Sequence, residues 1–375
     1  MESKKQDDVV EAASRCVQLL RHAELQACDA AWSEAAAALL SHVHKTVGAC
    51  VSRKWQVAAE AALVIPALLA ILTRAAAQPS LKLDAVHALR LTICTNETNQ
   101  KLASPAAAVL VALATVLPPP PPPSEGPKAA LLARNVAEQL RDAALEALSD
   151  LVFMHTPSQD AAIAADVIKH LLMFIGCTAG QNTNAAATQE RALRVLANVT
   201  RGNVRPCILR STCMLISPQK VFLPRRFACC SVLTLPPPPP PPCQVDAAKA
   251  AADSCAVVAL VAAGRARLAS QQTKELVVDA LISLCSFPEV ADAACAQGVL
   301  PLMMELLHAQ PLACSCAVAA LRCCCMLMYG RGDMCRAAAE AGLHTTLHAL
   351  KGKQYGDELE ALSLNAGTLM LPYTT

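Results

Sequence analysis

The sequence predicts an all-α protein built as a solenoid, which is a stack of similar helical units. A helical unit recurs, because the layout around Gly298 returns around Gly342, 44 residues further along the chain. Repeats of that length are typical of helical solenoids. Hydrophobic residues make up 54% of the 375 residues but aromatic residues only 3%. Such a composition favours helices, because Ala and Leu are strong helix formers whereas a sheet core would use Val, Ile and aromatic residues.

The clearest copy of the unit lies between residues 290 and 350. An Ala-rich helix runs into Gly298, a second apolar helix follows over Val299–His308, and a third occupies about Ala313–Met328. The string RAAAEAGLHTTLHAL then repeats the layout of DAACAQGVLPLMMELL. This layout resembles the armadillo repeat, in which a Gly separates a short first helix from the second. The resemblance implies a right-handed superhelical solenoid of three-helix repeats, with a concave surface of third helices that binds other proteins.

Each third helix is recognised by a core leucine at the end of an A-x-x-A-L-like string. These leucines are Leu89, Leu148, Leu196, Leu281, Leu321 and Leu362. They predict about six repeats over residues 49–368, preceded by an N-terminal helical cap over residues 1–48, since a terminal unit must present a polar face to water. The expected repeat boundaries are 49–97, 98–154, 155–202, 203–287, 288–330 and 331–368.

Two steps between successive leucines, of 59 and 85 residues, are too long for the repeat, and both contain a proline tract. The shorter one holds a proline-rich stretch at 118–127, which we interpret as an external loop because polyproline cannot continue a helix. The longer one holds an irregular, proline-rich insertion at 204–244, whose removal leaves a step of 44 residues. Two interpretations stay open for it. One is a retained intron, because Val-Arg and Cys-Gln at its ends are compatible with splice-site codons, and the other is a disordered loop of the protein.

Charge and hydropathy exclude several classes of partner. The chain has 32 basic and 30 acidic residues, so it has no strong basic field for nucleic acids or anionic membranes. Its longest apolar runs, 61–72 and 105–117, are shorter than the roughly 18 residues of a membrane-spanning helix. The first residues, MESKKQDDVVEAASR, resemble neither a signal nor a transit peptide. We therefore expect a monomeric cytoplasmic protein, with nuclear or ciliary residence left open.

Several groups of residues suggest chemistry at first sight. The chain has 19 cysteines, among them Cys323, Cys324 and Cys325, but consecutive helical residues point about 100° apart and cannot share one metal ion. In a reducing compartment we expect these cysteines to act as small hydrophobic side chains. His344 and His348 share a helical face, yet the residue after the first His is Thr345, where zinc proteases carry Glu. With no nucleophile motif or phosphate-binding loop, the sequence predicts no enzyme, no metal and no cofactor.

The resemblance also indicates where a ligand would bind. In armadillo proteins the residue two positions after the core leucine is often an Asn that binds the main chain of an extended peptide. Only Asn198 matches that pattern here, and the residue two positions before the leucine is charged or polar in several repeats. The predicted groove residues are Asn198, Arg194, Asp150, Glu146, His87, Asp279 and Ser283. The alternative for Asn198 is a hydrogen bond within the junction between two repeats.

These observations together predict a non-enzymatic scaffold or adaptor that binds a partner protein or an extended peptide in its groove. The second function that we keep is a regulatory factor or chaperone for a globular client, such as a small GTPase or a cytoskeletal protein.

Overall fold

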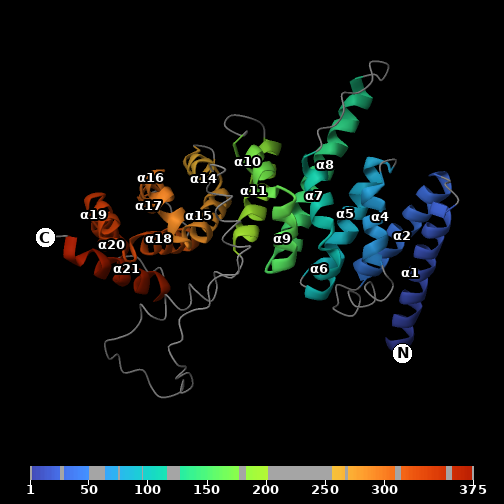
Figure 1. Ribbon diagram of the computed structural model, residues 1–375, viewed down its shortest axis with the longest axis horizontal. Helices are drawn as coiled ribbons and strands as arrows, with labels where there is room; N and C mark the ends of the chain where they lie inside the picture. The colour runs from blue at the N-terminus through green and yellow to red at the C-terminus, as the bar shows by residue number, and fades with distance from the viewer. Residues whose placement is uncertain are drawn as a thin grey trace. The chain divides into compact units, whose positions relative to one another are not determined.

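The computed structural model describes residues 2–25, 29–49, 64–74, 77–94, 96–115, 127–176, 183–201, 256–266, 269–308, 314–351 and 357–373. Every regular element within these ranges is helical, as predicted (Figure 1). The chain divides into two compact units, Met1–Val199 and Thr200–Thr375, called unit 1 and unit 2 below. Nearly all of the proline-rich stretch at 118–127 and all of the insertion at 204–244 lie outside the described residues, so both interpretations stay predictions.

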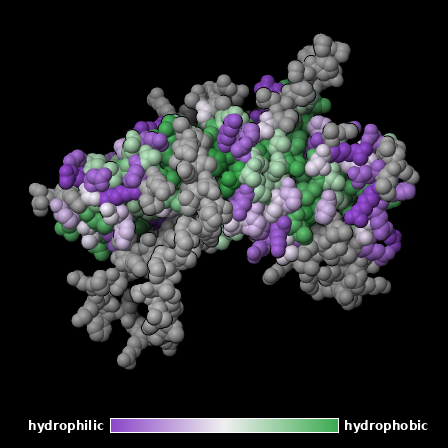
Figure 2. Space-filling view, viewed as in Figure 1, coloured by the Kyte–Doolittle hydropathy of each residue, from purple (hydrophilic) through white to green (hydrophobic). Residues whose placement is uncertain are grey.

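Unit 1 begins with two long helices, α1 (Glu2–Leu25) and α2 (Asp29–Ala49), which pack against each other. Trp32 on α2 is 2% exposed, and the guanidinium of Arg74 lies 4.3 Å from the centre of its ring. Arg74 follows α4 (Val64–Thr73) and also forms a 2.5 Å ion pair with Asp29. The contacts of Arg74 join the N-terminal helices to the helices that follow. Figure 2 shows hydrophilic side chains over much of the end of unit 1 that α1 and α2 form.

The rest of unit 1 repeats an order of short, medium and long helix. After α4 come α5 (Pro79–Ile93), α6 (Glu97–Ala103), α7 (Ala106–Thr115), α8 (Pro127–Val152), α9 (Thr156–Ala164), α10 (Val167–Gly176) and α11 (Thr183–Thr200). The helix starts are encoded locally. Asn96 accepts a hydrogen bond from the backbone N–H of Asn99 at the start of α6, and α5 and α9 have a Pro in their first turn.

Unit 2 continues in the same manner. Its helices are α14 (Ala256–Arg265), α15 (Gln271–Cys285), α16 (Pro288–Ala296), α17 (Val299–His308), α18 (Cys314–Met328), α19 (Gly332–Glu340), α20 (Leu343–Lys351) and α21 (Asp357–Met370), followed by the 3₁₀ turn Leu371–Tyr373. Here α14 packs on α15, α17 on α18, and α20 on α21. The third helices are also neighbours of one another, because α15 packs on α18 and α18 on α21.

The core consists of the leucines that identified the third helices, together with small residues around them. Leu89, Leu148 and Leu196 lie on α5, α8 and α11, and each is at most 1% exposed. Leu281 and Leu321 are fully buried on α15 and α18, and Leu362 on α21 is 7% exposed. The leucine register therefore located the third helices correctly in both units.

The turn between first and second helix requires a left-handed backbone in three repeats. Gly298 lies between α16 and α17 with φ of +84°, and Gly342 between α19 and α20 with φ of +81°. Both are therefore at the position where the armadillo resemblance implies Gly. In the turn between α9 and α10, Asp166 adopts φ of +56°, which residues other than Gly do less readily.

A side chain at the start of a first helix caps the end of the preceding third helix. The donor lies seven residues after the carbonyl in each case: Asn99 Nδ2 donates to Thr92 O (2.8 Å), Gln159 Nε2 to Val152 O (3.0 Å) and Cys335 Sγ to Met328 O (3.3 Å). The last carbonyls of a helix have no partner within the helix. These side-chain bonds therefore add a donor to the last carbonyls of the third helices, where Val152 O also accepts from the His155 N–H and Met328 O from the Arg331 N–H.

Candidate functional site: the third-helix face

Five of the seven predicted groove residues lie on the third helices of unit 1. His87 is on α5, Glu146 and Asp150 are on α8, and Arg194 and Asn198 are on α11. Arg194 is exposed, Asn198 is 7% exposed, and the other three are partly buried. We call the side chains that α5, α8 and α11 contribute at these positions the third-helix face.

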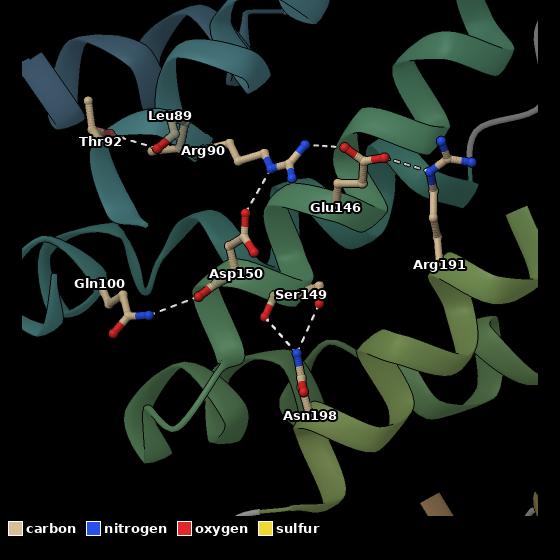
Figure 3. Close-up of polar contacts among 9 residues, drawn as sticks. All are labelled: Leu89, Arg90, Thr92, Gln100, Glu146, Ser149, Asp150, Arg191 and Asn198. Carbon is tan, nitrogen blue, oxygen red and sulfur yellow. Dashed lines mark hydrogen bonds and ion pairs between the residues drawn. The ribbon is translucent and has the colours of Figure 1, made fainter. Parts of the chain in front are cut away.

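Ion pairs connect the three helices across this face, as Figure 3 shows. From α5, Arg90 pairs with Glu146 and, through Nε, with Asp150 Oδ2 at 2.7 Å. From α11, Arg191 pairs with Glu146 Oε1 at 2.7 Å and with Asp142 Oδ2 at 3.2 Å. Glu146 thus lies between two guanidinium groups from different repeats. The face brings Glu146 and Asp150 together through Arg90, which the sequence analysis had not identified.

The arginines determine the protonation of the central carboxylate. Partial burial is the largest single effect on Glu146 and would raise its pKa. The hydrogen bond from Arg191 and the charges of Arg90 and Arg191 together outweigh that effect, so the pKa of Glu146 lies below its ordinary value. Glu146 is therefore ionised at neutral pH, and its charge is compensated within the protein.

Asn198 is largely committed to the structure of unit 1. Its Nδ2 donates to Ser149 O at 3.1 Å and to Ser149 Oγ at 2.9 Å, so α11 is joined to α8 (Figure 3). The backbone carbonyl of Asn198 accepts a 3.0 Å hydrogen bond from Gln159 Nε2. Asn198 therefore forms hydrogen bonds within the junction between two repeats, which was the alternative to binding a ligand. The amide nitrogen is thus already occupied in the absence of a ligand.

Arg194 differs from its neighbours on the face. It lies on the same helix as Arg191 and Asn198, but it is exposed and forms no ion pair with any described residue. The carboxylates of Asp142, Glu146 and Asp150 all have arginine partners. Among the predicted groove residues of unit 1, Arg194 is therefore the charged side chain with uncommitted donors.

The remaining two predicted residues, Asp279 and Ser283, lie on α15 in unit 2. Asp279 Oδ2 forms a 2.7 Å ion pair with Arg201 Nη2, and Ser283 Oγ donates to the carbonyl of Asp279 at 3.0 Å. Burial raises the pKa of Asp279, an effect that the charges of Arg201 and Arg322 only partly offset. Ser283 is 3% exposed, so its hydroxyl serves the helix itself.

The sequence contained a signal for part of this network. Acidic residues recur every four positions along α8, at Glu138, Asp142, Glu146 and Asp150, which places them on one helical face. That spacing would have identified Asp142. Arg90 and Arg191 had no comparable signal, because Arg90 and Glu146 are separated by 56 residues and meet only through the packing of α5 on α8.

The burial expected of the cysteines is confirmed for most of those that the structure describes, although Cys94 is exposed and Cys16 and Cys295 are only partly buried. Cys323, Cys324 and Cys325 on α18 are at most 4% exposed, and Cys316 and Cys335 are also buried. Burial raises the pKa of Cys325 to about 12 and that of Cys324 further. His344 and His348 on α20 are exposed, and within the described residues no group of three or more His, Cys, Asp and Glu side chains could hold a metal ion.

No single described helix is long and apolar enough to cross a bilayer. The bent pair Val290–Ala296 and Val299–His308, at 66° to each other, passes by length and composition when the two are combined.

Comparison with known proteins supports the architecture only. No protein-family model matches the chain, and no curated protein matches it in sequence. Among solved structures, an engineered protein from the Northeast Structural Genomics Consortium has a TM-score of 0.58 at 17% identity, covering 82% of this chain and 97% of that one. A designed armadillo repeat protein has a TM-score of 0.55 at 14% identity, covering 82% of this chain and 99% of that one.

A second designed armadillo repeat protein, solved in complex with the peptide (KR)4, has a TM-score of 0.57 at 14% identity, over 82% of this chain and 99% of that one. At such low identity these likenesses concern the backbone arrangement and not the side chains that bind a ligand. Together with the helix order and the glycine turns described above, they show that this chain has an armadillo-like repeat fold.

Proposed function

We propose that the protein is a non-enzymatic scaffold that holds an extended segment of a partner protein along the third-helix face of unit 1. The fold supports this, because solenoid repeats present extended surfaces to other proteins. A designed armadillo protein of similar fold has been solved with a bound peptide, (KR)4. That peptide belongs to the designed protein, and its sequence is not carried over to this chain.

The observation that carries the proposal is the contrast between Arg194 and the residues around it. The ion pairs of Arg90 and Arg191 hold α5, α8 and α11 together without using Arg194. An exposed guanidinium on a preorganised surface can form bidentate bonds to a carboxylate, or donate to a main-chain carbonyl, with little reorganisation. Arg194 is therefore the residue through which we expect the face to contact its partner.

The test uses the full chain and a partner identified by proximity labelling in the native cell. We expect Arg194→Ala to weaken partner binding by roughly 5-fold or more, as loss of a central interface Arg does. Lys169→Ala is the matched control, because Lys169 is an exposed cation of the same repeat but lies on the second helix α10. Binding would be measured by titration calorimetry. Equal affinity of Arg194→Ala and the unchanged chain would exclude the third-helix face as the site.

Binding experiments with the same partner distinguish a scaffold for extended segments from a regulatory factor or chaperone for a globular client. Synthetic peptides that tile the partner would be titrated alongside the intact partner. A scaffold for extended segments binds one of those peptides with an affinity near that of the intact partner. Binding that needs the folded partner would instead favour the regulatory factor or chaperone.

A further inference from the structure

Apolar side chains are exposed at one end of the third-helix face of unit 1. Leu91, two residues after the core leucine of α5, is 42% exposed, and Phe153, directly after α8, is 41% exposed. Cys94, at the end of α5, is also exposed. A single exposed leucine needs no explanation, but these three side chains belong to neighbouring third helices that pack on each other. We call them the apolar end of the third-helix face.

The helical register places the apolar end on the same side as the predicted groove residues. Leu91 is one turn after His87 on α5, and Phe153 is three residues after Asp150 of α8. The 2.7 Å ion pair of Arg90 with Asp150 joins α5 and α8 at this level. A ligand that lies along the face therefore reaches the apolar end.

The carboxylates between the apolar end and α11 already have partners within the protein. Glu146 is paired with Arg90 and Arg191, and Asp150 is paired with Arg90. Arg194 on α11 is exposed and forms no ion pair with any described residue. The described part of the face thus presents an apolar surface on α5 and α8 and an unpaired positive charge on α11.

The face offers little to the main chain of a ligand, so its side chains must select the ligand. The amide of Asn198 would be the group to bind a main chain, but its Nδ2 already donates to Ser149 O and Ser149 Oγ. The guanidinium of Arg194 is planar, and its parallel N–H groups match the two oxygens of a carboxylate. An acidic side chain is therefore the group that complements Arg194 best.

The spacing of the helices sets the distance between the two contacts. α8 lies between α5 and α11, because Glu146 is paired with an arginine from each of them. Packed helices are about 8–10 Å apart, so α5 and α11 are about 16–20 Å apart. An extended chain covers about 3.3 Å per residue, so the ligand side chains that reach α5 and α11 are about five or six positions apart.

Resting on the function proposed above, we propose that the partner segment carries an acidic side chain and a large apolar side chain about five or six positions apart. The carboxylate pairs with Arg194, and the apolar side chain packs on Leu91 and Phe153. Burial of the exposed apolar surface supplies affinity. The ion pair at the other end sets the register and the direction of the segment. A basic side chain at the same place would bring a like charge to Arg194.

The test selects ligands for the full chain from a phage-displayed library of random 12-residue peptides. We expect the enriched peptides to carry Asp or Glu about five or six positions from Leu, Ile, Met or Phe. An enriched peptide, made synthetically, is then titrated by fluorescence anisotropy. Its affinity should fall roughly 5-fold or more with Arg194→Ala and with Leu91→Ser.

Leu364→Ser is the matched control for Leu91→Ser. Leu364 is an exposed leucine at the same register position, two residues after the core leucine of α21, but it belongs to unit 2. The peptide should bind this variant as tightly as the unchanged chain. Circular dichroism of each variant shows whether the helices have formed.

A change in the peptide tests the ion pair without altering the protein. Replacing the acidic residue of the peptide by its amide should weaken binding to the unchanged chain roughly 5-fold or more. The same replacement should have no further effect on binding to Arg194→Ala, because the ion pair is already absent there.

The outcomes separate the nature of the ligand from the location of the site. Peptides that need Arg194 but lack an acidic residue, or that bind Leu91→Ser unchanged, would overturn the acidic and apolar ligand and leave the third-helix face as the site. Peptides that bind both variants as tightly as the unchanged chain would count against the ligand and the face together. Failure to enrich any peptide would overturn the ligand alone, since the calorimetric titration of the partner tests the face independently.

Discussion

At the scale of single residues, the structure separates side chains that hold repeats together from those that are available to a ligand. The sequence predicted both Asn198 and Arg194 as groove residues, because each occupies a groove position in the armadillo repeat. The structure assigns them different surroundings, since Asn198 bonds Ser149 and Arg194 is exposed. The difference was not visible in the sequence, because it depends on the distance between α8 and α11.

The role of Asn198 is tested by its removal. We expect Asn198→Ala to lower the free energy of unfolding by about 1–3 kcal/mol, because the buried Ser149 carbonyl and hydroxyl lose their donor. Denaturant titration followed by circular dichroism measures the change. Arg194→Ala on the same helix serves as control and should stay within about 0.5 kcal/mol of the unchanged chain. Equal stability of the two variants would contradict a junction role for Asn198.

His155 predicts a pH dependence of stability. It is 4% exposed, and its Nδ1 lies 2.7 Å from Ser158 Oγ. Burial lowers the pKa of His155 in the folded protein. As pH falls through the ordinary histidine pKa of about 6.5, the unfolded chain binds a proton that the folded chain does not. The free energy of unfolding should therefore fall between pH 7.5 and 5.5.

The control for the pH dependence of stability is His155→Gln, because glutamine does not bind a proton between pH 7.5 and 5.5. Denaturant titrations at several pH values should show a steeper loss of stability for the unchanged chain than for the variant. Parallel curves would mean that His155 has no part in the pH dependence.

At the scale of secondary-structure elements, the helices and many of their ends follow from local sequence, but not every turn does. The glycines at positions 298 and 342 were recognised because they recur at the repeat period. Asp166 occupies the corresponding turn with a similar backbone, and nothing in its neighbourhood suggested so. The sequence of the repeat departs from the glycine pattern at Asp166. Only the structure shows that the same left-handed turn is formed by Gly in two repeats and by Asp in a third.

The turn at Gly298 tests whether backbone conformation or space selects glycine. A Cβ added there would have no atom nearer than 3.8 Å, so steric crowding is excluded, but φ is +84°. We expect Gly298→Ala to lower the free energy of unfolding by about 1 kcal/mol through backbone strain.

Gly176, the last residue of α10, is the matched control. It also has open space around its Cβ position, and its φ is outside the left-handed region. Gly176→Ala should be neutral or slightly stabilising, since Ala has less freedom in the unfolded chain. Similar losses in both variants, measured by thermal unfolding, would argue against the left-handed turn as the cause.

At the scale of the whole molecule, the sequence sufficed for the class of fold and the placement of the third helices. Leucine spacing is a local property that survives low identity, and it located α5, α8, α11, α15, α18 and α21. The contacts that build the site could not be predicted in the same way. Arg90 with Glu146 and Arg191 with Glu146 join residues 56 and 45 positions apart, and a single sequence does not record such pairs.

The insertion at 204–244 supplies a prediction at this scale. If it is foreign to the repeat, a chain without it keeps the 44-residue step between Leu196 and Leu281. We expect that shortened chain to fold with a melting temperature within about 2 °C of the full chain, because solenoid stability comes from repeats and their neighbours. A large loss of helical signal would contradict this.

Sequencing of the transcript distinguishes a retained intron from a loop of the protein. An mRNA that lacks the segment encoding residues 204–244 supports the retained intron. Peptides from residues 204–244 in stable protein exclude it.

The bonds from the start of one repeat to the end of the one before it have a practical consequence for dissecting the protein. Val152 O accepts from Gln159 as well as from the His155 N–H, and Met328 O from Cys335 as well as from the Arg331 N–H, so the last turn of a third helix is completed by residues that follow it. A fragment cut directly after such a helix would carry a bare carbonyl end and fray from it. Fragments meant to report the behaviour of fewer repeats should therefore extend through the next short helix, and their boundaries belong after residue 164 or 340 and not after residue 152 or 328.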